Sequence, residues 1–325
     1  MLPVAVDAMG GDDAPEAVIA GVRMAIARGH EVLLVGRPDV LATASDIPGI
    51  AASEVIEMDD DAAQGVRRKK DSSLVRAAEA VRDGKASAMV SAGNTGATMA
   101  SALLRMGRIK GVSRPAIATP IPTLGPTPTT LLDAGANAEC QPEWLAQFAQ
   151  MGSIYAQHRY GLAAPRVGLL SIGEESSKGT PMVKATHALL QHTPGINFVG
   201  NVEGRDVMTG SADVIVTDGF TGNVVLKTLE GGVGHVLDAI RAVFDSSAEY
   251  RAAADTLMPD LGPLLDVLTA EVVGGAMLLG VDGVCIISHG SSSPLAIANA
   301  LDVARDMVEA NLVEAIRLTI AGIEP

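Results

Sequence analysis

The stretch VIVTDGFTGNVVLK, from Val214 to Lys227, decides the fold of this chain. An apolar, β-branched run leads into a loop of glycines, hydroxyls, a carboxylate and an amide, and a helical apolar pattern then resumes. This order predicts a buried strand, a loop that faces a ligand and a helix, which is the repeating unit of α/β proteins.

The same arrangement recurs along the chain. Its other copies are Pro3–Val6 followed by DAMGGDD, Ala88–Val90 by SAGNTGAT, Thr130–Leu132 by DAGANAE, Val167–Leu170 by SIGEESSKGT, Ile196–Val199 by GNVEGRD, and Val284–Ile287 by SHGSSSP. We therefore expect a three-layer α/β/α fold with a mainly parallel sheet. The carboxyl ends of parallel strands share one edge, so we expect the loops to meet in one anion-binding site. Turns and helix caps are the alternative explanation for any single loop.

Composition narrows the range of functions. The chain has 24 Lys and Arg against 38 Asp and Glu, which gives a net charge of −14, and only 2% of its residues are aromatic. Both features disfavour a nucleic-acid partner.

Its two cysteines, Cys140 and Cys285, form no disulfide framework or zinc motif. The first residues lack a basic leader, so we expect a cytoplasmic protein. We predict no metal site and no cofactor, because no histidine pair and no dinucleotide fingerprint occur.

The length of 325 residues suits one large domain, and we treat residues 1–325 as a single unit. The segment ATPIPTLGPTPTT, Ala118–Thr130, contains four prolines and marks a candidate crossover between subdomains. Residues 37–62 are acidic and show no regular pattern.

Two side chains in the strand-end loops are the first candidates for catalysis. Lys178 lies in GEESSKGT, where glycine and lysine are transposed relative to a nucleotide-binding P-loop, so we expect one lysine that reaches a phosphate. His289 follows the strand GVCII and is placed to act as a general acid or base. A solvated lysine and a structural histidine are the alternatives.

Basic residues are concentrated in two stretches. One contains Arg67 and Lys70, and the other contains Arg105, Arg108, Lys110 and Arg114. In so acidic a chain these stretches would attract an anionic substrate or partner, although solvated helix faces explain them equally.

A leucine stripe lies near the end of the chain, at Leu257, Leu261, Leu264, Leu265 and Leu268, and is interrupted by Pro259 and Pro263. Such a stripe is core, a dimer face, or a helix lying on a membrane. The segment from Leu257 to Val273 carries no lysine or arginine, which disfavours electrostatic membrane attachment.

Several motifs together resemble the bacterial phosphate acyltransferase family of phospholipid synthesis. They are VAVDAMGGDDAPEAV, RRKKDSS, SAGNTGATMA, GRIKGVSRPA, LLDAGANAE, IGEESSKGT, VTDGFTGNVVLKTLEGG and GGAMLLGVDGVCIISHGSSS, and they cover nearly the whole chain in the family's order. The resemblance implies a fold like that of phosphotransacetylases and isopropylmalate dehydrogenases. It also implies a homodimer and attack of inorganic phosphate on the thioester of a long-chain acyl–acyl carrier protein. The acyl phosphate formed would supply a membrane glycerol-3-phosphate acyltransferase, with peripheral contact at the inner face of the membrane.

On this basis we assign expected roles. Lys178, His289 and Asn223 are predicted to be catalytic, with Lys178 neutralising phosphate or the oxyanion and His289 protonating the leaving thiol. The predicted phosphate and substrate-binding residues are Asp7, Gly10, Gly11, Asn94, Thr95, Gly96, Glu203, Asp218, Thr221 and Gly222. The acidic carrier protein is expected to dock on Arg67, Lys70, Arg105, Arg108, Lys110 and Arg114.

Three other functions remain open from the sequence. They are a phosphotransacetylase-like enzyme that uses acyl-coenzyme A, a non-catalytic scaffold that binds acyl groups or phosphate, and a dehydrogenase of similar fold. The missing dinucleotide fingerprint disfavours the dehydrogenase.

Overall fold

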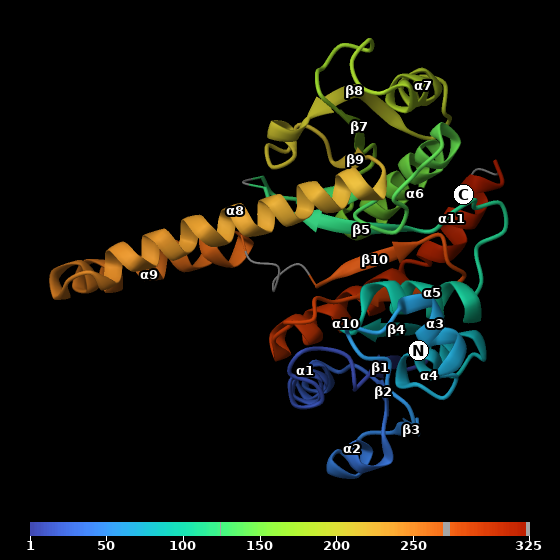
Figure 1. Ribbon diagram of the computed structural model, residues 1–325, viewed down its shortest axis with the longest axis vertical. Helices are drawn as coiled ribbons and strands as arrows, with labels where there is room; N and C mark the ends of the chain where they lie inside the picture. The colour runs from blue at the N-terminus through green and yellow to red at the C-terminus, as the bar shows by residue number, and fades with distance from the viewer. Residues whose placement is uncertain (124, 269–273, 323–325) are drawn as a thin grey trace.

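A computed structural model describes residues 1–123, 125–268 and 274–322. It confirms the α/β prediction, because an eleven-stranded, mostly parallel sheet lies between two layers of helices (Figure 1). The strands, in their order across the sheet, are β3 (Gly49–Ala51), β2 (Val32–Gly36), β1 (Val4–Asp7), β4 (Ala88–Ser91), β11 (Val284–Ile287), β10 (Ala276–Leu279), β5 (Ala116–Ile121), β6 (Thr129–Leu132), β9 (Val214–Val216), β7 (Arg166–Ser171) and β8 (Asn197–Glu203). Central strands such as β1, β4 and β11 are buried throughout, as continuous apolar runs covered on both faces must be.

Helices cover both faces of the sheet. The first face packs against α1 (Glu16–Ala27), α2 (Pro38–Thr43), α6 (Pro142–Tyr160), α7 (Pro181–Leu190), α10 (Pro294–Glu309) and α11 (Leu312–Ile320), which share the largest apolar core. The second face packs against α3 (Ala62–Arg68), α4 (Ser73–Arg82), α5 (Thr95–Arg105) and the start of α8 (Gly219–Asp245). A short 3-10 helix, Gly204–Asp206, follows β8.

The direction of the strands reverses in the middle of the sheet. The neighbours of β10 on both sides are antiparallel to it, and β5 is antiparallel to β6. The carboxyl ends of β1, β4 and β11 therefore lie at one edge, which we call the first edge, and those of β6, β9, β7 and β8 lie at the opposite, second edge. The expectation that all strand-end loops share one edge is wrong.

Other sequence-based expectations need correction as well. Residues 37–62 contain helix α2 and strand β3, although their acidic character suggested irregular structure. Strand β8 continues through Glu203, so the first part of GNVEGRD is strand and its last three residues form the 3-10 helix Gly204–Asp206. Strands β5 and β10 were not predicted, because antiparallel strands in the middle of a sheet carry no strand-end loop of the expected composition. The proline-rich segment Ala118–Thr130 spans the β5–β6 turn, where the strand direction reverses.

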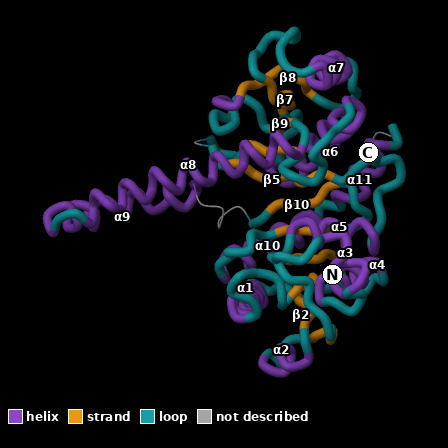
Figure 2. The backbone as a smooth tube through the Cα atoms, in the orientation of Figure 1, coloured by secondary structure: helices purple, strands orange, loops and turns teal. Residues whose placement is uncertain are grey.

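Helices α8 and α9 (Ala248–Leu268) form a hairpin that projects away from the sheet (Figure 1). Figure 2 shows the projecting part as two helices joined by a short turn at its tip. Pro259 and Pro263 lie within α9 without ending it, contrary to the expected interruption. Leu257 and its neighbour Met258 are exposed, so this part of the leucine stripe does not belong to the core. Residues 269–273 of the segment from Leu257 to Val273 lie outside the described residues. Within the described residues, we find no helix with the length and apolar character that crossing a bilayer requires.

Candidate functional site

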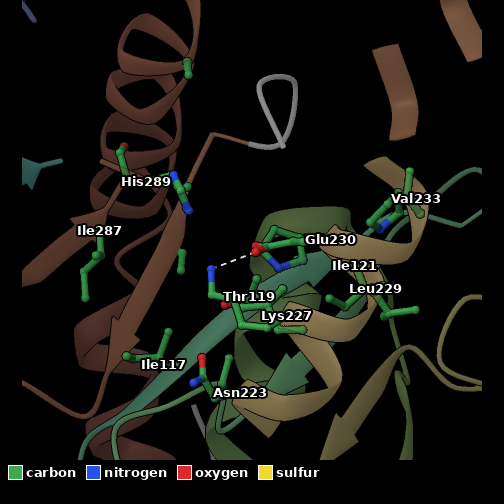
Figure 3. A pocket seen from close by; sticks show the side chains of 18 of the residues that line it. Ile117, Thr119, Ile121, Asn223, Lys227, Leu229, Glu230, Val233, Ile287 and His289 are labelled. Atoms are coloured by element: carbon green, nitrogen blue, oxygen red, sulfur yellow. Dashed lines mark hydrogen bonds and ion pairs between the residues drawn. The ribbon is translucent and has the colours of Figure 1, made fainter. Parts of the chain in front are cut away.

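A cavity of about 520 Å³ lies on the second face of the sheet, between α5 and α8 (Figure 3). Its floor is formed by β5, the start of β10 and the end of β11. The residues that line it are Thr95, Ile117, Thr119, Pro120, Ile121, Pro122, Ala134, Met208, Asn223, Leu226, Lys227, Leu229, Glu230, Val233, Gly234, Leu237, Gly275, Ala276, Ile287, Ser288, His289, Ser291, Ser292 and Ala296. It has the size of a small-molecule site and combines an apolar wall with a few polar groups.

One polar wall comes mainly from the loop after β11, and Thr95 at the start of α5 adds a hydroxyl. His289 is exposed toward the cavity, and its Nδ1 lies 2.8 Å from Ser291 Oγ. The Ser291 backbone N–H donates to the same Nδ1, so the neutral ring carries its proton on Nε2. His289 can therefore donate a hydrogen bond from Nε2 to a bound oxygen or sulfur atom.

Ser288 adds a buried hydroxyl to this wall. The residue is only 4% exposed, and its Oγ has no hydrogen-bond partner within the part of the chain that the structure describes. A buried polar atom without a partner costs about 1–3 kcal/mol. The residue lines the cavity but its Oγ is buried, so an oxygen of a bound ligand would satisfy this hydroxyl after rotation of the Ser288 side chain.

Helix α8 contributes three polar side chains to the opposite wall. The Asn223 amide is exposed and has no hydrogen-bond partner among the described residues. One turn further, Lys227 Nζ forms a 2.7 Å ion pair with Glu230 (Figure 3). Lys227 is the one lysine or arginine among the described lining residues. Sequence reasoning missed it, although its spacing of four from Asn223 places both on one helix face.

The start of α8 is fixed by its own loop residues. Asp218 is the N-cap and accepts hydrogen bonds from both the backbone N–H and the hydroxyl of Thr221, each at 2.8 Å. A Cβ at Gly222 would lie 1.9 Å from the carbonyl oxygen of Asp133, so only glycine allows this close packing. Three features of this loop thus position Asn223 and Lys227. They are the carboxylate of Asp218, the hydroxyl of Thr221 and the lack of a side chain at Gly222.

Asp133 is the centre of this packing, and sequence reasoning did not single it out. Its fully buried carboxylate accepts hydrogen bonds from the backbone N–H groups of Ile117, Gly135, Ala136 and Asn137 and from the Asn137 side chain. Burial raises the pKa of this carboxyl, and the hydrogen bonds oppose that change. The loop LLDAGANAE is therefore a folded support for the α8 end of the cavity.

At the first edge, Asp7 has a comparable role. It is buried at the end of β1, accepts a 2.8 Å hydrogen bond from Ser91 Oγ, and accepts another from the Met9 backbone N–H. Burial raises its pKa, against the hydrogen bonds from Ser73, Ser91 and Met9. Gly10 packs so closely that a Cβ would lie 2.5 Å from the nitrogen of Gly93.

The other loops at the first edge are also held by close backbone packing and by hydrogen bonds to their own residues. Gly11 approaches the carbonyl of Gly290, which brings the loop after β1 against the loop that holds His289. Asn94 caps α5 by accepting from the Ala97 N–H, and its amide donates to the carbonyls of Met58 and Asp60. Gly96 faces Ala62 of α3 at a distance that excludes a side chain. Of these loop residues only Thr95 lines the cavity.

Lys178 and Glu203 lie outside the cavity. Lys178 is exposed in the loop after β7, and within the described residues its ammonium has no ion pair or hydrogen bond. Glu203 ends β8, caps the 3-10 helix and pairs with Arg205 at 3.1 Å. Of the residues predicted from the sequence, the structure thus brings Thr95, Asn223 and His289 together at the cavity. Asp218, Thr221 and Gly222 lie behind Asn223. Lys178 and Glu203 lie apart from this group.

The two basic stretches lie toward opposite edges of the sheet. Arg67 and Lys70 are exposed and precede Ser73, which contacts Asp7 at the first edge. The residues Arg105, Arg108, Lys110 and Arg114 lie at the second edge, where the backbone of Ile109 pairs with Gly280 after β10. In this second set Arg105 lies 3.7 Å from Glu79, Arg108 donates to the Ser113 carbonyl, Arg114 covers the Trp144 ring, and Lys110 is exposed.

Neither cysteine is suited to covalent catalysis. Burial raises the pKa of both Cys140 and Cys285 to about 12, so their thiols stay protonated at neutral pH. Among the described residues there is no cluster of three or more histidine, cysteine or acidic side chains placed to hold a metal ion.

Comparison with known proteins identifies the family of the chain. A family model described as "Fatty acid synthesis protein" matches residues 2–315. A phosphate acyltransferase of Desulfitobacterium hafniense (strain Y51) is 47% identical over 326 residues, covering 98% of this chain and 97% of that protein. One from Myxococcus xanthus (strain DK1622) is 50% identical over 316 residues, covering 93% and 89%.

The chain belongs to the phosphate acyltransferase family. It is an enzyme of this type, and acyl transfer to phosphate is its reaction class.

Solved structures of similar fold support the architecture. A phosphotransacetylase from Streptococcus pyogenes matches with a TM-score of 0.62 at 17% identity, covering 96% of this chain and 94% of that one. The EutD phosphotransacetylase from Staphylococcus aureus matches with a TM-score of 0.59 at 17% identity, covering 94% of each. At such identities the likeness concerns the fold alone, and it fits the expected phosphotransacetylase-like fold.

Proposed function

We propose that this enzyme transfers a long-chain acyl group from acyl carrier protein to inorganic phosphate, giving acyl phosphate for phospholipid synthesis. The observation that carries the proposal is the cavity between α5 and α8, in a chain of this family. It combines an apolar wall with His289, Ser288, Asn223 and Lys227. An acyl tail requires the apolar part, and a phosphate and a thioester require the polar part.

The reaction follows from the donors around the cavity. A phosphate oxygen attacks the thioester carbonyl carbon, the carbonyl oxygen becomes an oxyanion, and the carbon–sulfur bond then breaks to release the carrier thiol. His289 donates from Nε2 to the oxyanion or to the leaving sulfur, and Ser288 and Asn223 supply further hydrogen bonds. Phosphate is itself the nucleophile, so the site needs to position two reactants and needs no nucleophilic side chain.

Two lysines are candidates for the cation that binds phosphate. Lys227 lines the cavity and would exchange its Glu230 partner for phosphate. Lys178, the residue predicted from sequence, is exposed outside the cavity and would have to move with its loop. We assign the phosphate contact to Lys227 and retain Lys178 as the alternative. Comparing the phosphate KM of Lys227→Ala and Lys178→Ala distinguishes the two.

Carrier-protein docking is proposed for the basic residues. Since the two stretches lie toward opposite edges, we expect one of them to dominate. The charge reversals Arg67→Glu with Lys70→Glu, and Arg108→Glu with Lys110→Glu, should identify it, because the dominant pair raises KM for acyl carrier protein and leaves the phosphate KM unchanged. Equal, small effects of both pairs would contradict docking on these residues.

A homodimer and peripheral contact with the membrane also belong to the proposal. The projecting hairpin exposes Val236, Ile240, Val243, Leu257 and Met258, and exposed apolar surface of this kind marks an interaction site. We assign the α8–α9 hairpin to the contact with a second copy. The same hairpin would approach the inner face of the membrane, where a glycerol-3-phosphate acyltransferase consumes the acyl phosphate. Light scattering and vesicle flotation test the two contacts separately.

The direct test supplies phosphate with either acyl–acyl carrier protein or the matching acyl-coenzyme A and traps acyl phosphate as a hydroxamate. We expect product with both and a clear preference for the carrier protein. Equal rates would favour the second candidate, a phosphotransacetylase-like enzyme, which the fold of the solved relatives supports. No product with either thioester would contradict the proposed function.

A further inference from the structure

One face of α8 forms an apolar wall along the cavity. Leu226, Val233 and Leu237 line it at helical spacing, together with Leu229 and Gly234. Residues at spacings of three and four lie on the same side of a helix, so these side chains form a continuous stripe. The lining begins at Asn223 and ends at Leu237, fourteen residues or about 21 Å along the helix axis.

The facing wall is mainly apolar, and Thr119 is a polar residue within it. It is formed by Ile117 and Ile121 of β5, by Pro120 and Pro122, and by Met208. The space between these walls also holds polar groups, at Asn223, Lys227 and Glu230 of α8 and at His289 opposite. A mainly apolar site with a few polar groups suits an unbranched alkyl chain that carries one polar head. A folded protein gains nothing by leaving such apolar surface in contact with water, so a ligand of this kind is the expected occupant.

We propose that the alkyl chain of the acyl group lies along this face of α8, and that the space beside Gly234 sets how long a chain is accepted. This inference rests on the proposed function, because it takes the acyl head to lie between Lys227 and His289. From Lys227, Gly234 is seven residues or about 10 Å further along the helix. An extended chain advances about 1.2 Å per bond, as an extended polypeptide does, so Gly234 faces roughly the eighth or ninth carbon.

Gly234 is suited to a test because a side chain can be added there without a clash. A Cβ at this position meets no atom within 4 Å, and the residue lines the cavity. Gly232 lies two residues earlier, has equally open surroundings, and is absent from the lining. Leucine at either position has the same effect on helix propensity, and only leucine at Gly234 fills the cavity.

The experiment measures kcat/KM for acyl–acyl carrier protein carrying C6 or C16 chains, using the wild type, Gly234→Leu and Gly232→Leu. We expect Gly234→Leu to lower the C16 value at least tenfold and to change the C6 value less than twofold, because a C6 chain ends before Gly234. Each methylene removed from the apolar site costs about fourfold, so displacing only two of them suffices. Gly232→Leu should leave both values within twofold of the wild type. Equal losses for both chain lengths, or no loss, would overturn the proposal.

Direct binding of a fluorescent C16 fatty acid separates this inference from the proposed function. If the wild type forms no acyl phosphate but Gly234→Leu still weakens binding of the probe, the alkyl site stands and the proposed function fails. If the wild type turns over and Gly234→Leu binds the probe as the wild type does, the alkyl site fails alone. If Gly234→Leu does not fold, Gly234→Ala replaces it. We then expect a smaller loss of kcat/KM that is confined to the C16 substrate. An unchanged C16 value would contradict the site.

Discussion

The strand-end loops and the wall of the cavity contain similar polar residues, but their side chains have different partners. In the loops, Asp133, Asn94 and Asp218 accept hydrogen bonds from backbone N–H groups of the same loop or helix. In the cavity wall, the Ser288 hydroxyl and the Asn223 amide have no partner within the described chain, and Lys227 has only a solvent-exposed ion pair.

This difference separates support from chemistry. A polar group already bound to its own backbone holds a loop in shape and has little capacity left for a ligand. A polar group that faces a cavity without a partner is available for substrate. Substitutions in the loops should therefore reduce stability, whereas substitutions in the cavity wall should reduce turnover.

The largest expected effect is that of Asp133→Ala. The substitution removes the acceptor of five hydrogen bonds and leaves one buried N–H donor, that of Ile117, and four partly buried ones without this acceptor. With about 1–3 kcal/mol for each such group, we expect the free energy of unfolding to fall by more than about 4 kcal/mol in urea denaturation. A loss below about 1 kcal/mol would show that the loop does not support α8.

The second prediction concerns Lys227→Met. A charge-assisted hydrogen bond contributes about 1.5–3 kcal/mol, so kcat/KM should fall by roughly 10- to 150-fold, with stability within about 1 kcal/mol of the wild type. Glu230→Gln is the matched control, because it removes the ion-pair partner and keeps the lysine, and it should retain turnover. If Lys227→Met turned over like the wild type while Lys178→Met did not, the cation of the site would be Lys178.

A smaller effect is expected from Asn94, which was predicted from sequence to bind substrate. Loss of the α5 N-cap in Asn94→Ala should lower the free energy of unfolding by about 1 kcal/mol. Asn94→Ser keeps a capping oxygen and should recover most of that stability. Both variants should turn over within about threefold of the wild type. A hundredfold loss of turnover in the stable serine variant would instead place Asn94 in the chemistry.

The smallest expected change is a pH effect at Asp7. Burial raises the pKa of its carboxyl, so the folded state holds the proton more tightly than the unfolded state. As the pH falls from the raised pKa toward the ordinary aspartate value of 3.8, the free energy of unfolding of the wild type should therefore rise relative to that of Asp7→Asn. The three hydrogen bonds that oppose burial keep this gain small. A relative loss of stability on acidification would contradict the direction.

The sequence predicted the fold class and most of the strands because buried parallel strands have a simple pattern. Strand Val284–Ile287 matches its expected bounds, and Ala88–Ser91 and Thr129–Leu132 each differ by one residue from the strands expected there. The reversal of strand direction was not predictable in this way. It depends on β5 and β10, whose antiparallel pairing is set by long-range contacts and not by a local motif.

The site was predicted in part for the same reason. His289, Asn223 and Thr95 were found because polar residues after strands in this fold tend to face ligands, and all three line the cavity. Composition alone could not separate Asp218, which caps a helix, from Asn223, which lies one turn later and faces the cavity. Lys227 was passed over because a lysine within a helix has the same pattern as a solvated one, and only the packing of α8 over β5 reveals its position.

The central claim is that acyl transfer takes place in the cavity between α5 and α8. A crystal structure of the enzyme with a bound long-chain acyl phosphate tests it most directly. We predict a chain lying against Leu226, Leu229 and Val233, with the phosphoryl oxygens within hydrogen-bonding distance of Lys227 and His289. An empty cavity, with the acyl phosphate bound instead beside the exposed loop of Lys178, would contradict the claim.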